Sequence, residues 1–201
     1  MSRYRGPRLK ILKKLGNLPG LTRKQSKKIS SAKEYTQQLK KTSEYALRLK
    51  EKQKIKFNYG LNERQLLKNI KIAKKNQGST GLILLQILEM RLDNTIFRIG
   101  FAPTIPAARQ IINHGHILVN NQIVSICSYE CKLGDTIAIK QKESSINLIK
   151  SHMKSSSLAN IPNHLKLESN KLIAKIHSII KRDWVALQLN ELLVIEYYSK
   201  K

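Results

Sequence analysis

Arginine and amide side chains recur at helical spacing between residues 91 and 113. At 100° per residue, Arg91, Asn94 and Arg98 fall within about 60° of one another, on a different face from the apolar side chains of the same segment. A second helix, capped by Thr104, turns further polar groups to one side, namely Arg109, Gln110 and Asn113. Because a guanidinium group can hold a phosphate bidentately or stack on an unpaired base, the spacing predicts two helices that share a core and turn an anion-binding face outward. The alternative is that these arginines only make the helix pair soluble.

The charge of the whole chain favours the first interpretation. The 201 residues carry 38 lysines and arginines against 13 acids, a net charge of +25. A chain with this charge repels itself unless a polyanion neutralises it, so nucleic acid is the leading partner and an anionic membrane surface is the alternative. The charge is concentrated at the start, where residues 1–60 hold 18 basic and 3 acidic residues. Such a basic amino terminus can also be an organelle transit peptide.

Several classes of protein do not fit the composition. The longest apolar stretch, residues 81–90, is half of the ~20 residues that a membrane span needs. The two cysteines are too few for a disulfide scaffold and indicate a reducing compartment. No acidic pair, nucleophile constellation or glycine-rich phosphate loop is evident in the sequence, so the nucleic acid is predicted to be bound and not chemically altered.

The sequence predicts neither a metal site nor a cofactor. Cys127 and Cys131, with His114 and His116, supply suitable ligand types, but their spacing matches no zinc finger or ribbon. The alternative is a pair of small buried residues near a turn and two histidines beside the nucleic acid. An imidazole there can contact a phosphate, since it has both donor and charge options.

The first half of the chain is predicted to be an arm followed by a helical domain. Residues 1–42 lack a sustained period and are broken by glycine and proline, which indicates an extended basic arm. The helical domain, residues 43–88, begins with a helix from a cap at Ser43 to a stop near Gly60. A second helix runs from a cap at Asn62 to Gly78. A third begins near Thr80 and continues through residue 100.

The second half changes character, so the predicted fold class is α+β. A module at residues 89–150 combines the helix pair with a short antiparallel sheet, which includes a tight type I′ hairpin at Asn120-Asn121 and a strand within residues 133–140. Residues 141–160 resemble a loose linker. The C-terminal segment, residues 151–201, is expected to pack back on the body, with HLKLES as a strand, KLIAKIHSIIKR as a helix and LLVIEYYSK as a strand.

These segments also resemble a known family. The string LEMRLDNTIFRIGFAPTIPAARQII, with HGHILVNNQIV after it, resembles the RNA-binding module named after small-subunit ribosomal protein four, which pseudouridine synthases and some tRNA synthetases share. SRYRGPRLK, LRLKEKQKIKFNYGLNERQ, RLDN and NELLVIEYYSK resemble the ribosomal protein family itself, in the family's order and over almost the full length. LKKLGNLPGLTRKQ is similar to plastid members in particular.

The resemblance implies a function. It implies primary binding to small-subunit rRNA at a multi-helix junction, nucleation of assembly of the subunit body and a contribution to translational accuracy. The implied partners are small-subunit rRNA, ribosomal proteins five and twelve, and mRNA near its entry path; membrane binding and homo-oligomers are not expected. The alternative is an RNA-modifying enzyme of the pseudouridine-synthase kind, but the 88 residues before the module are too basic and too helical for a catalytic domain.

The resemblance also carries expectations about location and metal. Because the family pattern begins at Ser2, we expect no transit peptide, a plastid location in the small ribosomal subunit, and encoding in the plastid. Many bacterial relatives hold zinc with cysteines in the first forty residues. This chain has no cysteine there, so that zinc site should be absent and the arm should be fixed by RNA alone.

Matching positions give the residues that the resemblance, together with the arginine face, predicts to contact RNA. They are Arg3, Tyr4, Arg5, Arg8 and Lys10 in the arm; Lys50, Lys52, Gln53, Lys54, Tyr59, Arg64 and Gln65 in the helical domain; and Arg91, Asn94, Arg98, Thr104, Arg109, Gln110, Asn113, His114, His116 and Asn120 in the module. The helix with Lys50 and Lys54 on one side and Lys52 and Lys56 on the other suits insertion between RNA segments. Tyr4 and Tyr59 could stack on bases, although tyrosines more often pack.

Overall fold

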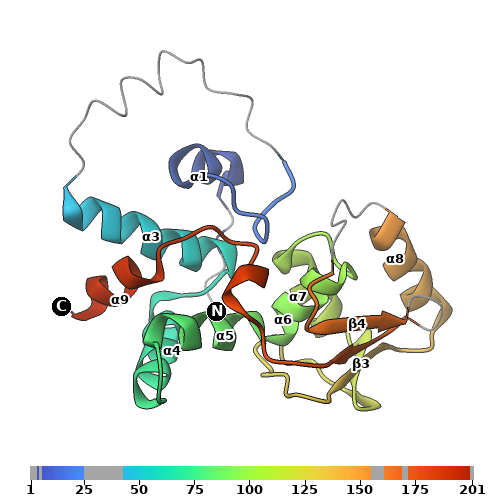
Figure 1. Cartoon of the computed structure of the whole chain (residues 1–201). Coiled ribbons are helices and arrows are strands. Elements are labelled where there is room, and N and C mark those ends of the chain that lie inside the picture. Colours follow the sequence, from blue (N-terminus) through green and yellow to red (C-terminus); the bar gives the residue numbers. More distant parts are fainter. Residues whose placement is uncertain (1–3, 5, 25–42, 155–160, 169–171, 200–201) are drawn as a thin grey trace. The chain divides into compact units, whose positions relative to one another are not determined.

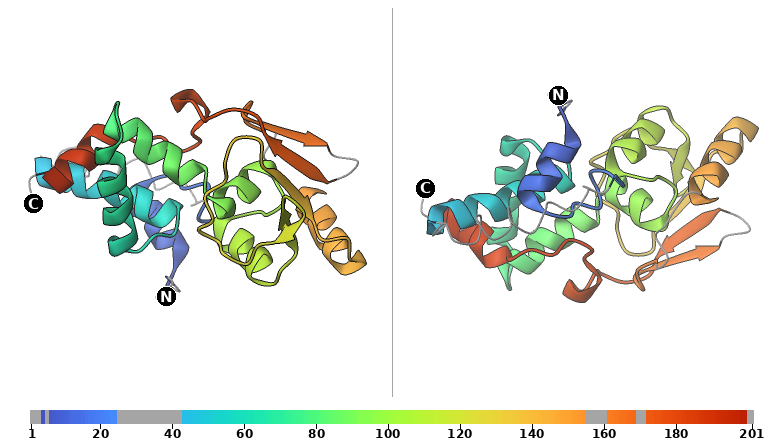
Figure 2. Two further views of the ribbon diagram at one scale, coloured as in Figure 1. Left: turned by 90° about the horizontal axis from the view of Figure 1, so that it is seen from below. Right: turned by 90° about the horizontal axis from the view of Figure 1, so that it is seen from above.

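The computed structural model describes residues 4, 6–24, 43–154, 161–168 and 172–199, and it separates into two compact units (Figures 1 and 2). Unit 1 comprises Met1–Gly81 and Leu187–Lys201, and unit 2 comprises Leu82–Ala186. The last residues of the chain therefore belong to the same unit as the first ones, whereas the predicted segment 151–201 is divided between the units. Helices and a five-stranded antiparallel sheet confirm the α+β class.

Unit 1 is built from helices. Their bounds are α1 Arg8–Leu15, α3 Glu44–Asn58, α4 Glu63–Lys75 and α9 Glu191–Ser199. Both predicted caps are confirmed: the Ser43 side chain accepts from the amide of Ala46, and Asn62 forms a capping box with Gln65. The second helix ends at Lys75, slightly before the predicted stop at Gly78.

Residues 8–15 form the helix α1, so the prediction of an extended arm is wrong there. The reason is an apolar stripe, because Ile11, Leu12 and Leu15 are buried against α3. The chain that follows is also fixed, since the amide of Gly20 donates to the side-chain oxygen of Asn58 at 2.9 Å. Of the predicted arm, residues 1–3, 5 and 25–42 lie outside the described residues.

The closing segment is the helix α9, not the predicted strand. It lies along α3, as Figures 1 and 2 show. Val194 and Tyr197, three residues apart and buried, give it a helical contact face. The side chain of Asn190 accepts from the amide of Leu192 at 3.1 Å, which helps to fix the start of the helix.

Unit 2 packs helices against the sheet. Its helices are α5 Thr80–Glu89, which begins at the boundary with unit 1, α6 Leu92–Ile99, α7 Ile105–Asn113, α8 Glu143–Lys154 and a short 3-10 helix, Arg182–Trp184. Its strands are β1 Ile117–Val119, β2 Gln122–Ile123, β3 Thr136–Ile139, β4 Leu165–Glu168 and β5 Ile173–Ile176, in the order β2-β1-β3-β5-β4. Buried side chains such as Ile96, Ile112 and Ile137 join the two layers into one core.

The predicted hairpin is confirmed. Asn120 and Asn121 have φ values of 49° and 65°, the left-handed conformation that a type I′ turn requires at both central residues. The turn sets the register, with Val119 opposite Gln122 and Leu118 opposite Ile123. The predicted strands in HLKLES and LGDTIAIK are also present, as β4 and β3.

Three other local predictions are wrong. Residues 143–154 form α8 rather than a linker, with Ile149 buried in the core; residues 155–160 lie outside the described residues. KLIAKIHSIIKR contains the strand β5, because Ala174 and Ile176 alternate into the core and the strand completes the sheet between β3 and β4. The third helix is interrupted at Met90 and Arg91. There the backbone of Arg91 is extended and forms an isolated antiparallel β-bridge with that of Glu130.

Candidate nucleic-acid interface

The predicted arginine face of α6 is buried. Arg91 is 8% exposed and Asn94 is 1% exposed. Arg91 donates to both carboxylate oxygens of Asp93, at 3.1 and 2.9 Å. Asn94 donates to the carboxylate of Glu89 at 2.7 Å and also to its backbone carbonyl. The prediction that these two side chains turn outward is therefore wrong.

Arg98 is held in the same way at the other end of α6. It is 8% exposed, donates from Nη2 to the carbonyl of Trp184, and its Nε lies 3.6 Å from the carboxylate of Glu89. All eight residues of α6 are buried, so the helix has no outward face. Neighbouring acids take up the guanidinium groups of Arg91 and Arg98.

Arg109 joins α7 to this buried cluster. Its Nε and Nη2 lie 2.8 and 2.7 Å from Oδ2 of Asp93. Thr104 caps α7, since its hydroxyl accepts from the amide of Ala107 at 3.3 Å. Both Arg109 and Thr104 therefore use their side chains for contacts within the protein that hold the helix pair in place.

Three predicted residues at the end of α7 are exposed: Gln110, Asn113 and His114. The side-chain oxygen of Asn113 accepts from the thiol of Cys127 at 3.0 Å. These side chains come from one helix end, so they can contact a partner together.

His116 belongs to a basic edge, formed by His114, His116, Lys140 and Lys142 at the α7–β1 turn and beyond the end of β3. The two imidazole rings are 6.0 Å apart, and the amide of Lys140 donates to the carbonyl of His116 at 2.9 Å. Nδ1 of His116 lies 2.8 Å from the hydroxyl of Ser145. Burial lowers the pKa of His116, and the positive charges of His114, Lys142 and Lys140 lower it further. An anion bound at this edge would offset that repulsion.

Asn120 uses its amide within the hairpin. Its Nδ2 donates to Oδ1 of Asp135 and its Oδ1 accepts from the amide of Thr136, both at 2.9 Å. The side chain therefore stabilises the β1–β2 turn against the start of β3. A contact with RNA would have to compete with these two hydrogen bonds.

The lysines of α3 are largely neutralised within unit 1. Lys52 is 5% exposed, and its Nζ lies 3.0 Å from both carboxylate oxygens of Glu63. Lys54 forms an ion pair of 2.6 Å with Glu51. The interpretation of α3 as a helix with two free basic sides is therefore wrong, while Lys50 remains exposed.

Other partners of α3 come from distant parts of the sequence. Arg48 pairs with Glu196 of α9 at 2.8 Å, and the hydroxyl of Tyr198 donates to Glu63 at 2.6 Å. Burial would raise the pKa of Glu63, but the hydrogen bonds from Tyr198 and Lys52 outweigh burial and lower it. Burial, followed by the hydrogen bond to Glu63 and the negative charge of that carboxylate, raises the pKa of Tyr198. α3, α4 and α9 are thus joined by polar contacts.

Of the other residues of unit 1 that were predicted to contact RNA, some are exposed and some are bound within the protein. Tyr59 is 1% exposed and packs in the core, so it is not available for stacking on a base. Gln65 belongs to the cap of α4, and Gln53 is half-buried. Tyr4 is 47% exposed, with its ring 5.4 Å from that of Phe57 in an edge-to-face contact. Arg3 and Arg5 lie outside the described residues.

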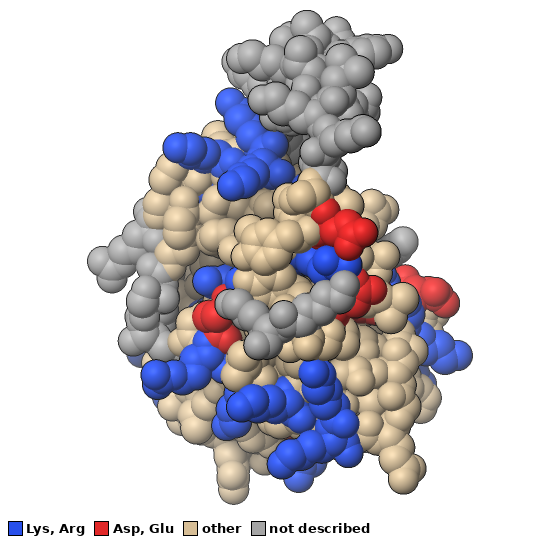
Figure 3. Space-filling model, turned by 90° about the vertical axis from the view of Figure 1, so that its left-hand side faces the viewer, with Lys and Arg blue, Asp and Glu red and all other residues tan. Residues whose placement is uncertain are grey.

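Two helices of unit 1 carry several exposed cations each. These are Arg8, Lys10, Lys13 and Lys14 on α1, and Arg64, Lys68, Lys71, Lys74 and Lys75 on α4. Figure 3 shows Lys and Arg side chains gathered at both ends of this face, with the visible acidic side chains between them. Like charges at i,i+4 destabilise a helix by roughly 0.2–0.5 kcal/mol per pair, so this pattern is unfavourable without a polyanion.

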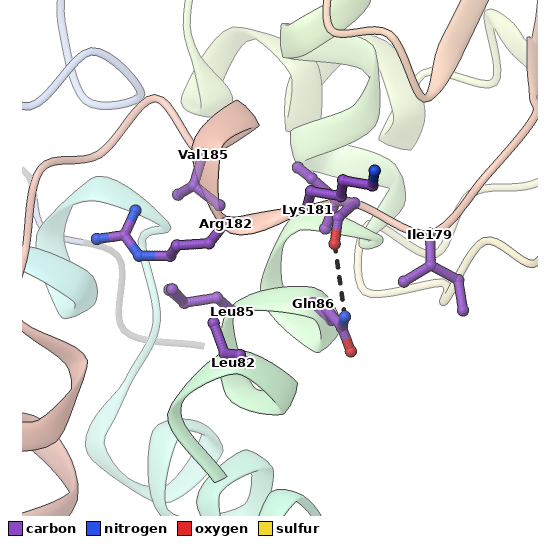
Figure 4. A pocket seen from close by; sticks show the side chains of 8 residues that line it. Leu82, Leu85, Gln86, Ile179, Lys181, Arg182 and Val185 are labelled. Carbon is purple, nitrogen blue, oxygen red and sulfur yellow. Dashed lines mark hydrogen bonds between the residues drawn. The ribbon is translucent and has the colours of Figure 1, made fainter. Parts of the chain in front are cut away.

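A pocket of about 390 Å³ lies in unit 2 (Figure 4). Leu82, Leu85 and Gln86 of α5 line it, together with residues 179–182 and Val185. The amide of Gln86 donates to the carbonyl of Ile180 at 3.4 Å. The lining is mainly aliphatic, with Gln86, Lys181 and Arg182 as its polar side chains, and it includes no histidine, cysteine or carboxylate.

The possible metal ligands are not gathered into a site. Within the parts of the chain that the structure describes, no group of three or more His, Cys, Asp and Glu side chains is placed to hold a metal ion. Cys131 is buried, and burial is the main cause that raises the pKa of its thiol to about 12. Likewise, no helix among the described residues is both long and apolar enough to cross a membrane.

Sequence reasoning missed several residues that define these surfaces. Lys140 and Lys142 follow a strand and carried no local signal, whereas Lys68, Lys71 and Lys75 repeat at helical spacing and could have been found that way. Glu196 could not have been assigned to Arg48, because the two are 148 residues apart.

Comparisons with known proteins agree along the whole chain. Residues 3–89 match the family model described as the ribosomal protein S4/S9 N-terminal domain, and residues 90–137 match the S4 domain. The chain is 67% identical to the small ribosomal subunit protein uS4c of Gracilaria tenuistipitata var. liui and 62% identical to that of Porphyra purpurea. It is 56% identical to the small ribosomal subunit protein uS4 of Trichodesmium erythraeum. Each comparison covers 100% of both chains.

Proposed function

Because the chain belongs to the S4 family of small-subunit ribosomal proteins, we propose that it is a primary binder of small-subunit rRNA that nucleates assembly of the subunit body. The family consists of ribosomal structural proteins, not enzymes. The alternative of an RNA-modifying enzyme is not supported.

The observation that carries the proposal is the distribution of paired and unpaired cations. Within unit 1 the acids neutralise α3, as in the pairs Lys52–Glu63 and Arg48–Glu196. Within unit 2 they neutralise the arginines of the helix pair, as in Arg109–Asp93. Other cations lie exposed, among them those of α1, α4 and the basic edge, where a polyanion can reach them.

From these surfaces we select the contacts. We propose that RNA phosphates are bound by Arg8 and Lys10 of α1, Lys50 of α3, Arg64 of α4, and the basic edge with Gln110 and Asn113. Tyr4 is sufficiently exposed to stack on a base. The buried side chains, Arg91, Asn94 and Arg98, act indirectly by holding the helix pair that carries the edge.

The setting and the remaining partners complete the proposal. The chain acts in the plastid small ribosomal subunit, because it is more similar to uS4c of Gracilaria, at 67% identity, than to uS4 of Trichodesmium, at 56%. In that subunit we propose contacts with ribosomal proteins five and twelve, a position near the mRNA entry path and a contribution to decoding accuracy. These roles rest on family membership.

A comparison of how the chain binds two RNAs of equal length but different fold tests the proposal. The full chain is titrated with the cognate small-subunit rRNA junction and with a scrambled RNA, each at two salt concentrations. Tight binding to the junction that resists the higher salt better than binding to the scrambled RNA is the expected result. If the affinities for the two RNAs are equal and fall equally with salt, the chain binds polyanions without selecting the junction.

A further inference from the structure

We propose that the outer face of α4 is a second RNA-binding surface, on which Lys68, Lys71 and Lys75 extend the contact of Arg64 along the phosphates of one RNA segment. The inference rests on the proposed function, since it requires that the chain binds rRNA. It adds three residues that neither the family resemblance nor the arginine pattern indicated.

The four side chains form one stripe. Their spacing of four, three and four residues places them within about 60° of one another on the helix. At 1.5 Å per residue, successive cations are about 4.5–6 Å apart along the axis, so the stripe is about 16 Å long. All four residues are exposed. A continuous row of this kind can neutralise consecutive phosphates.

The core side of α4 lies opposite the stripe. Leu66, Ile70 and Ala73 are at most 2% exposed, and their mean direction is about 160° from that of the stripe. Contacts with the core therefore leave the stripe free to meet a partner. In Figure 3 a group of Lys and Arg side chains lies over α4 at the lower end of the face, and the visible acidic side chains lie above it.

The charge pattern distinguishes this face from an ordinary solvated helix. A solvated helix usually mixes both signs, and its i,i+4 pairs attract. Here Arg64–Lys68 and Lys71–Lys75 are like-charge pairs, and Glu63, the acid of α4, is already bound to Lys52 and Tyr198. The stripe thus lacks internal compensation within α4, and a polyanion supplies it.

RNA fits this surface better than a membrane does. The apolar face that would enter a bilayer is the one buried in the core, where Leu66 is 0% exposed. The stripe is a line of point charges without an aromatic side chain on α4, which suits a regular phosphate backbone rather than base stacking. The expected ligand is therefore the sugar-phosphate backbone, read without base specificity.

The test removes three charges and keeps the helix. A variant with Lys68→Gln, Lys71→Gln and Lys75→Gln is compared with a control of equal charge, Lys150→Gln, Lys166→Gln and Lys175→Gln, whose lysines are exposed on unit 2. Glutamine is about as good a helix former as lysine, so α4 should persist, which circular dichroism and thermal melting check. The affinity of each variant for the rRNA junction, without other ribosomal proteins, is measured from 50 to 200 mM salt.

The α4 variant should bind on the order of 10²-fold more weakly at 0.1 M salt, with a salt slope about 2–3 units shallower, whereas the control changes little. Equal losses in both variants would show that only net charge matters and would overturn the inference. If the unaltered chain binds tightly and the α4 variant binds equally well, the inference is also overturned. A loss of affinity in the α4 variant that is seen only when other ribosomal proteins are added would overturn it too. Failure of the unaltered chain to prefer the junction would instead contradict the proposed function.

Discussion

Arg109 of α7 and Asp93 of α6 form an ion pair that ties the two helices together, with Nη2 2.7 Å from Oδ2. The same carboxylate accepts two hydrogen bonds from Arg91 and is itself 1% exposed. A buried acid therefore sets the geometry of the helix pair. The guanidinium groups of Arg91 and Arg109, which the sequence predicted to contact RNA, are bound by this carboxylate within the protein.

Asp93→Asn should be strongly destabilising. Removing one partner of a buried ion pair typically costs about 3–5 kcal/mol, because the remaining charges lose their compensation. Urea unfolding followed by circular dichroism measures the change in the free energy of unfolding. The control is Asp183→Asn, an exposed acid whose replacement should stay within about 0.5 kcal/mol. Equal effects of the two substitutions would show that the pair contributes little.

Affinity for the rRNA junction should fall steeply with salt. With at least 6 phosphate contacts, counterion release predicts a loss of roughly 10³-fold between 50 and 200 mM salt. Filter binding or fluorescence anisotropy at four salt concentrations gives the slope. A nearly flat dependence would remove charge neutralisation as the main source of affinity.

Junction binding should tighten as the pH falls, through His116. Burial and three neighbouring positive groups lower the pKa of its imidazole in the free protein. A bound phosphate offsets those charges and raises the pKa, so binding takes up a proton and affinity increases below the ordinary value of about 6.5, by at most about tenfold per pH unit. Affinities are measured at pH 7.5 and 5.5 for the chain and for His116→Gln. The exposed His177→Gln serves as control. The pH response should be smaller in His116→Gln than in the unaltered chain, and an equal response in both contradicts the assignment.

Stability should fall in acid because of His164. This residue is 1% exposed and stacks on Trp184, and burial, followed by the charge of Arg98, lowers its pKa to about 4. A lowered pKa means that the unfolded chain binds the proton first. The imidazole's contribution is thus fully present above about pH 6.5 and is lost as the pH falls to about 4, by about 3 kcal/mol in all.

His164→Phe should keep the stacking and remove this dependence. The difference in the free energy of unfolding between the chain and the variant is followed from pH 7 to 4.5, which cancels the contributions of the carboxylates. We expect the difference to change in favour of the variant by about 1.4 kcal/mol per pH unit below pH 6.5. A constant difference would show that the ring is protonated as easily in the folded protein as in the unfolded chain.

Tyr198→Phe should loosen α9. The substitution deletes the hydroxyl that donates to Glu63 at 2.6 Å. Because the Glu63 side chain is 43% exposed, we expect a loss of only about 1 kcal/mol. Hydrogen exchange of the α9 amides should accelerate more than that of α6. The control Leu192→Ala, an exposed position on the same helix, should leave both rates nearly unchanged.

Local signals were sufficient for the parts of the fold that short-range chemistry determines. Ser43, Asn62 and Thr104 cap helices where their side chains meet the first free amides, and Asn120 with Asn121 adopts the backbone of a tight hairpin. These features depend on residues within a few positions of one another. They can therefore be predicted without knowledge of the tertiary structure.

Long-range packing decided what could not be predicted. β5 is a strand because β3 and β4 supply hydrogen-bonding partners on either side, and α9 is a helix because α3 offers it a surface. The direction of Arg98 depends on Glu89 and on the carbonyl of Trp184, 86 residues away. The composition thus indicated a polyanion partner, but which cations remain exposed depends on where the few acids fold.

The distance in sequence between Arg48 and Glu196 has a consequence for the order in which the chain is made. Glu196 follows Arg48 by 148 residues. At about 5–20 residues per second, translation needs roughly 7–30 s to cover that interval. During this time the nascent chain carries Arg48 with its neighbour Glu44 on α3 but without Glu196. The ion pair that joins α3 to α9 can therefore form only after the carboxyl terminus has been made.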